Sequence, residues 1–277
     1  MLSGAFDDEL ALAREAAERA GALALALQRQ GVSHWLKGPG NPVTEADLAL
    51  DRLLKEALLG ARPEFGWLSE ETADSPGRLG ARALWVVDPI DGTRDFLRGR
   101  PGWAVSVALV VGGRVEAGVL AAPARQTVYA ARRGGGATCN GRPIAVSGRG
   151  ADWPVRLPIE PQVLTSPLWG EGFVAEAVDK PNSLALRLAL VAEGAADAMV
   201  DGRHCSEWDV AAASLIVAEA GGMVSTRDGA PIRFNKPEPG VAGLVAATPA
   251  WHAPMQARLE AALHALAERR RRSATTG

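Results

Sequence analysis

An apolar segment that ends on two closely spaced acids constrains the fold of this chain more than any other feature. Residues 84–96 read LWVVDPIDGTRDF, so the hydrophobic run stops at Asp88, and Asp91 follows after a proline. The run has the length and composition of a strand, which we expect over 83–87. Two carboxylates three residues apart across a tight turn can converge on one cation, and with a backbone carbonyl between them they suit Mg²⁺. An Asp-Gly surface turn that caps the following helix stays open as the alternative.

The residues directly after Asp91 are suited to an anionic ligand. Gly92 lets the backbone approach a ligand closely, and Thr93 begins a predicted helix. Backbone amides at a helix N-terminus are a natural seat for phosphate. The segment therefore places cation ligands and phosphate ligands side by side in the sequence.

The rest of the first half predicts two helices followed by a sheet. Apolar positions recur at helical spacing over 10–27, and a second helix runs over 45–59 with Thr44 as its N-cap and Asp47 at its third position. A Gly/Pro loop, KGPGNPVTEAD, separates the two helices. Short β-branched runs predict strands at 103–111, 115–121, 127–131 and 143–146. We expect an antiparallel meander covered by the two helices.

Strands and helices alternate in the second half. Residues 148–175 are rich in Gly, Pro and Trp and have weak periodicity, so they predict little. Beyond them we expect helices at 183–193, 208–220 and 253–271 and strands at 196–200, 223–225 and 243–247. The predicted fold class is α/β, with an α+β first half and an α/β second half, in two subdomains, 1–147 and 148–277.

Composition excludes several classes of protein. The 30 Lys and Arg and 32 Asp and Glu give a net charge of −2, which argues against a binder of nucleic-acid polymers and against attraction to an acidic membrane surface. No apolar run approaches the roughly 18 residues that span a bilayer, and the acidic N-terminus lacks the basic start of a signal peptide. Two cysteines, Cys139 and Cys205, make no disulfide framework. We expect a soluble, cytoplasmic protein.

Three further segments carry acids at turns or helix starts, namely 41–47 (NPVTEAD), 69–71 (SEE) and 206–209 (SEWD). Alone, each has an ordinary structural explanation as a capped helix start, a pair of solvated acids or an N-cap. Together and in this order, GNPVTEAD, SEE, DPIDGTRDF and EWDVAAASLIVAEAGG resemble the inositol monophosphatase superfamily over about residues 37–222. The resemblance implies a layered α/β/α/β/α sugar-phosphatase fold and a Mg²⁺-dependent, Li⁺-sensitive phosphomonoesterase.

The resemblance also implies which residues bind the metals. Glu70, Asp88 and the Ile90 carbonyl would hold the first Mg²⁺, and Asp88, Asp91 and Asp209 would hold the second. Clustered carboxylates repel one another without a cation, so chelation should destabilise such a site.

The roles in catalysis follow the same resemblance. Thr93 with Asp47 would orient and deprotonate the attacking water, assisted by Glu70. The amides of Gly92 and Thr93 would hold the phosphate, beside Asp91 and Asp209. A third metal would lie near Lys37. The nucleophile is water, because the sequence offers no residue that we prefer for a phospho-enzyme.

The substrate prediction depends on finer likeness. Arg94-Asp95-Phe96 after DGT and the Ser-Glu-Trp-Asp motif at 206–209 are similar to bacterial 3′(2′),5′-bisphosphate nucleotidases, which act on 3′-phosphoadenosine 5′-phosphate. Lys180, Asn182 and Ser183 are then candidates for the substrate pocket, with a loop and an N-cap as the equally open alternative.

Other features favour other members of the superfamily. His204-Cys205 resembles inositol monophosphatases, and Gly99-Arg100-Pro101 is shared with histidinol phosphatases, so both substrates stay as alternatives. A catalytically silent binding protein is disfavoured because all the metal carboxylates are present. The expected partner is a small phosphorylated metabolite rather than a nucleic-acid polymer or a membrane. Relatives often dimerise, so a homodimer is compatible with the resemblance.

Overall fold

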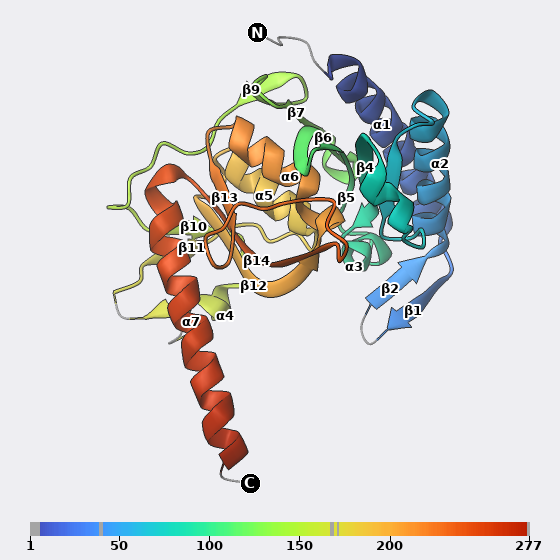
Figure 1. The fold of residues 1–277 in the computed structure, drawn as a ribbon. Coiled ribbons are helices and arrows are strands. Elements are labelled where there is room, and N and C mark those ends of the chain that lie inside the picture. The colour runs from blue at the N-terminus through green and yellow to red at the C-terminus, as the bar shows by residue number, and fades with distance from the viewer. Residues whose placement is uncertain (1–5, 39–40, 167–168, 171, 276–277) are drawn as a thin grey trace.

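The protein has five layers in the order helix, sheet, helix, sheet, helix (Figure 1). The computed structural model describes residues 6–38, 41–166, 169–170 and 172–275. In these residues no helix is long and apolar enough to cross a membrane. The mixed α/β class that the sequence predicts is confirmed.

The first two layers are a helix pair and a seven-stranded sheet. The sheet follows the order β3-β4-β5-β6-β7-β8-β9, in which β3 and β4 are parallel and every later pairing is antiparallel. Helices α1 (Asp7–Gln30) and α2 (Glu45–Ala61) pack on one face through a core of apolar side chains. The strands are β3 (Gly66–Ser69), β4 (Ala83–Asp91), β5 (Ala104–Val111), β6 (Arg114–Ala122), β7 (Thr127–Arg132), β8 (Ala137–Cys139) and β9 (Arg142–Ile144).

The middle layer is a pair of almost wholly apolar helices, α5 (Leu184–Ala192) and α6 (Glu207–Glu219). They bury side chains against the seven-stranded sheet on one side and against a three-stranded sheet on the other. Because both sides are covered, neither helix needs a polar face. Both helices begin close to the carboxyl end of β4, because residues from all three places line one cavity.

The second sheet contains β12 (Ala198–Ser206), β14 (Gly240–Ala247) and β13 (Met223–Thr226), in that order. Strand–helix alternation favours neighbouring parallel strands, but β14 lies between the other two, and both pairings are antiparallel. Helix α7 (Pro249–Thr275) covers the outer face through a third core and then extends beyond the body (Figure 1).

Several short elements differ from the sequence prediction. The predicted Gly/Pro loop holds an antiparallel hairpin of β1 (His34–Gly38) and β2 (Asn41–Thr44). Strand β4 continues to Asp91 instead of ending at 87, with an irregularity in its pairing to β5 between Asp88 and Asp91. The weakly periodic stretch contains β10 (Val155–Leu157), α4 (Pro161–Leu164) and β11 (Ala175–Ala177). The helix predicted after Gly92 is α3 (Thr93–Leu97).

Candidate active site

An acidic cavity of about 490 Å³ lies where β4 ends and α5 and α6 begin. Its walls are formed by residues from both halves of the sequence, which explains why the site depends on the whole fold. The lining includes Lys37, Glu70, Asp88, Ile90, Asp91, Gly92, Thr93, Asn182, Arg187, Asp201, Arg203, Cys205 and Asp209. We call it the acidic cavity below.

The end of β4 places two carboxylates in the acidic cavity. Asp88 is 1% exposed, and one of its oxygens accepts a hydrogen bond of 3.0 Å from the Ile90 amide. This contact bends the chain across Pro89 so that Asp91 also faces the cavity. Gly92 follows with φ of 98°, and a Cβ there would lie 2.6 Å from the Gly102 carbonyl oxygen. Only glycine therefore allows this approach of the two backbones.

Asp91 joins β4 to the start of α5. Its carboxylate accepts hydrogen bonds from the Ser183 hydroxyl at 2.5 Å, the Ala185 amide at 2.7 Å and the Leu184 amide at 3.2 Å. The same Ser183 hydroxyl accepts a bond from the Leu186 amide and so caps the helix. Burial raises the pKa of Asp91, and these hydrogen bonds from the start of α5 oppose that rise because amides at a helix N-terminus stabilise a negative charge.

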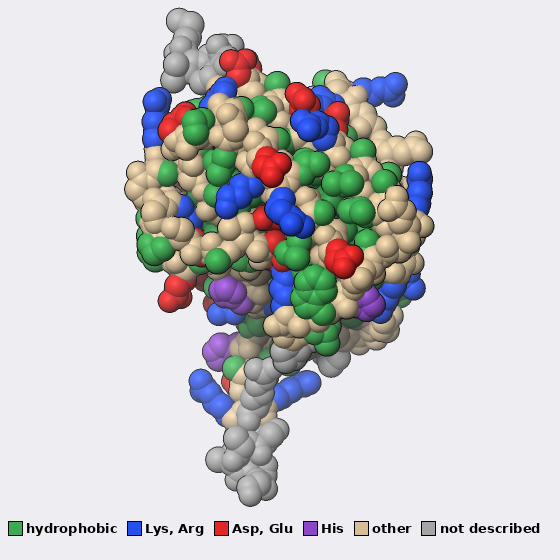
Figure 2. All heavy atoms as spheres, turned by 90° about the vertical axis from the view of Figure 1, so that its right-hand side faces the viewer, with side chains coloured by type: hydrophobic (Ala, Val, Ile, Leu, Met, Phe, Trp, Pro, Cys, Tyr) green, Lys and Arg blue, Asp and Glu red, His purple; other side chains and the backbone are tan. Residues whose placement is uncertain are grey.

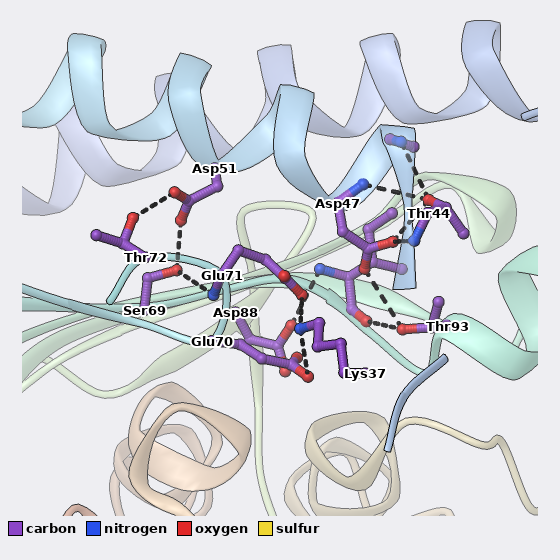
Figure 3. A network of polar contacts seen from close by, with 12 residues as sticks. Lys37, Thr44, Asp47, Asp51, Ser69, Glu70, Glu71, Thr72, Asp88 and Thr93 are labelled. Carbon is purple, nitrogen blue, oxygen red and sulfur yellow. Dashed lines mark hydrogen bonds and ion pairs between the residues drawn. The ribbon is translucent and has the colours of Figure 1, made fainter. Parts of the chain in front are cut away.

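Asp47 connects the start of α2 to Thr93 (Figure 3). One carboxylate oxygen accepts bonds from the Thr44 amide and hydroxyl at 2.8 and 2.6 Å, which completes the predicted capping box. The other oxygen lies 3.4 Å from the Thr93 hydroxyl, which also lies 3.1 Å from the Ile90 carbonyl oxygen. Burial raises the pKa of Asp47 to about 6, although the bonds from Thr44 act in the opposite direction.

Glu70 and Glu71 follow β3, and both form an ion pair with the side chain of Lys37. The Lys37 ammonium group, from β1, lies 3.4 Å from a Glu70 oxygen and also pairs with Glu71 (Figure 3). These acids are therefore not the freely solvated pair that is the usual outcome for such a sequence. The loop is fixed from behind by Asp51 of α2, which accepts bonds from the hydroxyls of Ser69 and Thr72.

Asp209 is the third residue of α6 and belongs to a second capping box. The Ser206 amide donates to one of its oxygens at 2.8 Å. The predicted N-cap role and a place on the wall of the acidic cavity therefore belong to the same side chain.

Burial and the charges of neighbouring carboxylates raise the pKa values of these acids. Burial raises the pKa of Asp88 well above its usual value, and the charges of Glu70, Asp91 and Asp209 raise it further. The pKa of Asp209 is also well above its usual value, first from burial and then from the charge of Asp91. Burial raises the pKa of Glu70, which Lys37 offsets only in part. A cation would relieve this repulsion.

The atoms of this site that could coordinate a metal ion are nearly all carboxylate or carbonyl oxygens, and such oxygens suit a hard divalent cation. In the described part of the chain, however, no three His, Cys, Asp or Glu side chains form a compact group ready to hold a metal ion. Many of the oxygens accept hydrogen bonds from the protein instead, as with Asp91 and Asp209. A bound cation would have to take the place of some of the N–H and O–H groups that now donate hydrogen bonds to these oxygens.

The structure separates the three residues predicted for the substrate pocket. Asn182 lies on the wall of the acidic cavity. Ser183 is fully buried, and its hydroxyl contacts Asp91. Lys180 lines two neighbouring cavities and pairs with Glu160 at 3.1 Å. The substrate roles of these residues stay predictions.

Sequence analysis missed three charged residues of the acidic cavity, Arg187, Asp201 and Arg203. Arg203 and Asp201 form an ion pair of 2.6 Å in the middle of β12, where its pairing with β14 is irregular. Arg187 is the one charged residue in the helix sequence LALRLALVA. A lone guanidinium in a buried apolar helix is the signal that could have identified it.

Known proteins resemble this chain over most of its length. The model of the inositol monophosphatase family matches residues 7–271. An inositol-1-monophosphatase from Mesorhizobium japonicum is 39% identical over 207 residues, which cover 70% of this chain and 75% of that protein. A histidinol-phosphatase from Chlorobaculum parvum is 35% identical over 233 residues, which cover 77% and 84%.

A solved structure of an extragenic suppressor protein, suhB, from Bartonella henselae has a TM-score of 0.80 at 30% identity. That match covers 91% of this chain and 98% of the other. The chain is thus a phosphoric monoester hydrolase. The chain belongs to the inositol monophosphatase family, whose members are generally metal-dependent. A closer relation to bisphosphate nucleotidases stays a prediction.

Proposed function

We propose that the chain is a Mg²⁺-dependent, Li⁺-sensitive phosphomonoesterase that hydrolyses small phosphorylated metabolites with water as the nucleophile. The observation that carries the proposal is the convergence of Glu70, Asp88, Asp91 and Asp209 on one cavity that also contains Thr93. These acids and the Ile90 carbonyl would hold two cations, and a third would lie near Lys37. Bound Mg²⁺ supplies the positive charge that a phosphate dianion and an attacking water both need.

The proton of the attacking water leaves through Thr93 in this proposal. The Thr93 hydroxyl can accept a hydrogen bond from the water while it donates to Asp47, 3.4 Å away. Asp47 has a pKa of about 6 and can accept a proton near neutral pH, as a general base should. Glu70, which lines the same cavity as Thr93, assists.

The phosphate is proposed to lie against Gly92 and Thr93. Both line the acidic cavity, directly after the end of β4. Asp91 and Asp209 line the same cavity, and as carboxylates they would favour a phosphate there only with cations bound. Backbone amides bind phosphate without the cost of ordering long side chains.

Two substrates have support. Relatives named inositol-1-monophosphatase and histidinol-phosphatase favour a polyol or amino-alcohol monophosphate such as inositol 1-phosphate. Arg187 and Arg203 at the edge of the cavity favour a substrate with a second negative charge, such as 3′-phosphoadenosine 5′-phosphate.

On the face shown in Figure 2, acidic and basic side chains are interspersed, which favours a small metabolite over a polyanionic polymer.

The test is phosphate release with and without Mg²⁺ from a panel of inositol 1-phosphate, histidinol phosphate and 3′-phosphoadenosine 5′-phosphate. We expect Asp88→Asn to lower turnover more than about 100-fold, because residues behind metal ligands alone change activity by roughly 10- to 100-fold. Asparagine keeps an oxygen for the Ile90 amide, so the fold should persist. The control is Asp228→Asn, an exposed acid that does not line the acidic cavity. Full activity in excess EDTA would refute the proposal.

A further inference from the structure

A cavity of about 380 Å³ lies at the end of the seven-stranded sheet opposite the acidic cavity. In β4, Ala83 pairs with Val111 of β5 and lies at the opposite end of the strand from Asp91. Arg114 of β6, which lines this cavity, pairs with the same Val111. At about 3.3 Å per residue, β4 rises roughly 25 Å from Ala83 to Asp91, and the two cavities share no described lining residue. The second cavity is therefore a separate one.

Three arginines and no acidic residue line this cavity in the described part of the chain, and we call it the arginine cavity. They are Arg114 at the start of β6, Arg133 after β7, and Arg233 between β13 and β14. Arg133 forms an ion pair of 3.2 Å with Glu116, which compensates its charge. Arg114 and Arg233 are exposed and form no ion pair or side-chain hydrogen bond with a described residue. Their two positive charges are available to a ligand.

The interior of the arginine cavity is apolar. Val115, Leu215 and Phe234 line it and are at most 6% exposed, and the partly buried Val224 and Ile232 complete its surface. All five belong to the core in which α6 packs or lie directly against it. An apolar group placed there leaves water, which favours its binding.

Hydrogen bonds hold one wall of the arginine cavity in place. The Phe234 amide donates to the Gly113 carbonyl oxygen at 3.1 Å. The next two amides, of Asn235 and Lys236, donate to the carboxylate of Glu207 at 2.7 and 3.2 Å. A wall that is already ordered spares a ligand part of the entropic cost of binding.

We propose that the arginine cavity binds a small organic anion, in which a phosphate, phosphonate, sulfonate or carboxylate group is attached to an apolar ring or short chain. The anionic group lies between Arg114 and Arg233, because planar guanidinium groups bind such oxygens through paired hydrogen bonds. The apolar part lies against Leu215 and Phe234. A volume of about 380 Å³ is near the lower end of the range of small-molecule sites, about 300–1,000 Å³, so a single ring fills it.

The arginine cavity is a binding site and not a second active site. No acidic residue of the described chain lines it, so it contains no carboxylate to hold Mg²⁺ or to accept a proton from water. A phosphate ester bound there is held and not hydrolysed.

The test uses the full chain in EDTA, because the carboxylates of the acidic cavity repel an anion when no cation is bound. Phenylphosphonate is the probe, since its carbon–phosphorus bond is not a phosphate ester bond. Calorimetry compares it with inorganic phosphate, which supplies the anion alone, and with benzyl alcohol, which supplies the ring alone. We expect the Kd of phenylphosphonate to be at least about tenfold lower than either, because only this probe makes both kinds of contact.

Arg114→Gln and Arg233→Gln should each raise this Kd at least about tenfold, the effect of one charge-assisted hydrogen bond. Neither side chain has a described partner, so the fold should persist. Arg142→Gln is the matched control. Arg142 begins β9 as Arg114 begins β6, and it is likewise exposed and without a described partner, but it does not line the arginine cavity. Its Kd should equal that of the wild type.

Hydrogen exchange locates the bound probe. The amides of residues 232–234 should exchange more slowly with phenylphosphonate, and those of residues 88–93 should not change. Protection confined to residues 88–93, no measurable binding, or affinity that survives both substitutions would refute the proposal. Equal affinity for inorganic phosphate, or an equal loss of affinity in Arg142→Gln, would refute it as well. Neither Mg²⁺ nor an ester bond enters this test, so its result is independent of the phosphomonoesterase function.

Discussion

A methyl group at Gly92 should damage both the fold and the site, because the backbone there has no room for a side chain. The φ of 98° costs an L-residue about 1–2 kcal/mol. The added Cβ would also lie 2.6 Å from the Gly102 carbonyl oxygen and 2.9 Å from the Ser183 amide nitrogen. Both are backbone atoms and cannot rotate away, and such overpacking costs about 1–3 kcal/mol more. Alanine also lowers the conformational entropy of the unfolded chain, which stabilises the folded state by about 0.4–1 kcal/mol. The net destabilisation expected for Gly92→Ala is therefore about 2–4 kcal/mol.

Gly99→Ala isolates the steric part of this effect. Gly99 follows the same short helix and also has a positive φ, 64°, but a Cβ there would meet no atom within 4 Å. We expect it to cost about 1 kcal/mol or less. Urea unfolding measures both variants, and Mg²⁺-dependent phosphate release should fall only in Gly92→Ala. Equal losses of stability in the two variants would show that the close approach of the backbones at Gly92 is not the constraint that we infer.

Two further predictions concern the pH and metal dependence of stability. Burial alone would raise the pKa of Asp197, but hydrogen bonds from the Arg156 side chain and amide hold it below its usual value. The folded state therefore binds this proton less readily than the unfolded state. The ionised Asp197 carboxylate therefore adds to the free energy of unfolding. This contribution is complete above the ordinary pKa of about 4, and it is lost as the pH falls through the lower pKa of the folded state. Arg156→Gln should cost about 2 kcal/mol at pH 7 and flatten this acid loss in thermal melts; an unchanged slope would contradict the pairing. Mg²⁺ at a hundredfold excess over its Kd should raise the free energy of unfolding by about 2.7 kcal/mol, an increment that Asp88→Asn should lose. The same melting temperature with Mg²⁺ and with EDTA would argue against the metal site.

The sequence predicts those parts of the site that local pattern determines. Thr44 and Asp47 form their capping box because the interaction spans only three residues. The run before Asp88 becomes a strand because it is apolar throughout, although pairing with β5 extends it to Asp91. Its exact end depends on a neighbouring strand that single-sequence pattern does not contain.

Features that depend on distant segments are not predictable in this way. The hairpin of β1 and β2 has a proline, Pro42, and too few residues to give a strand pattern, yet it carries Lys37 to Glu70. A cavity of about 940 Å³ is lined both by Arg187 on α5 and by Leu263 on α7, and no local rule relates residues so far apart. Antiparallel insertion of β14 between β12 and β13 likewise depends on long-range pairing.

The structural and the chemical explanations of the acids turn out to be compatible. Asp47 and Asp209 each give one oxygen to the N-cap residue of a helix, and Asp91 accepts two amides at the start of a third. Helix N-termini stabilise a nearby carboxylate by about 0.3–1 kcal/mol, which opposes the burial that raises these pKa values. Two of these helix starts place Asp91 and Asp209 on the wall of the acidic cavity, and the third holds Asp47 beside Thr93. The N-cap pattern that made each acid look purely structural is therefore the means by which the fold assembles the acidic cavity.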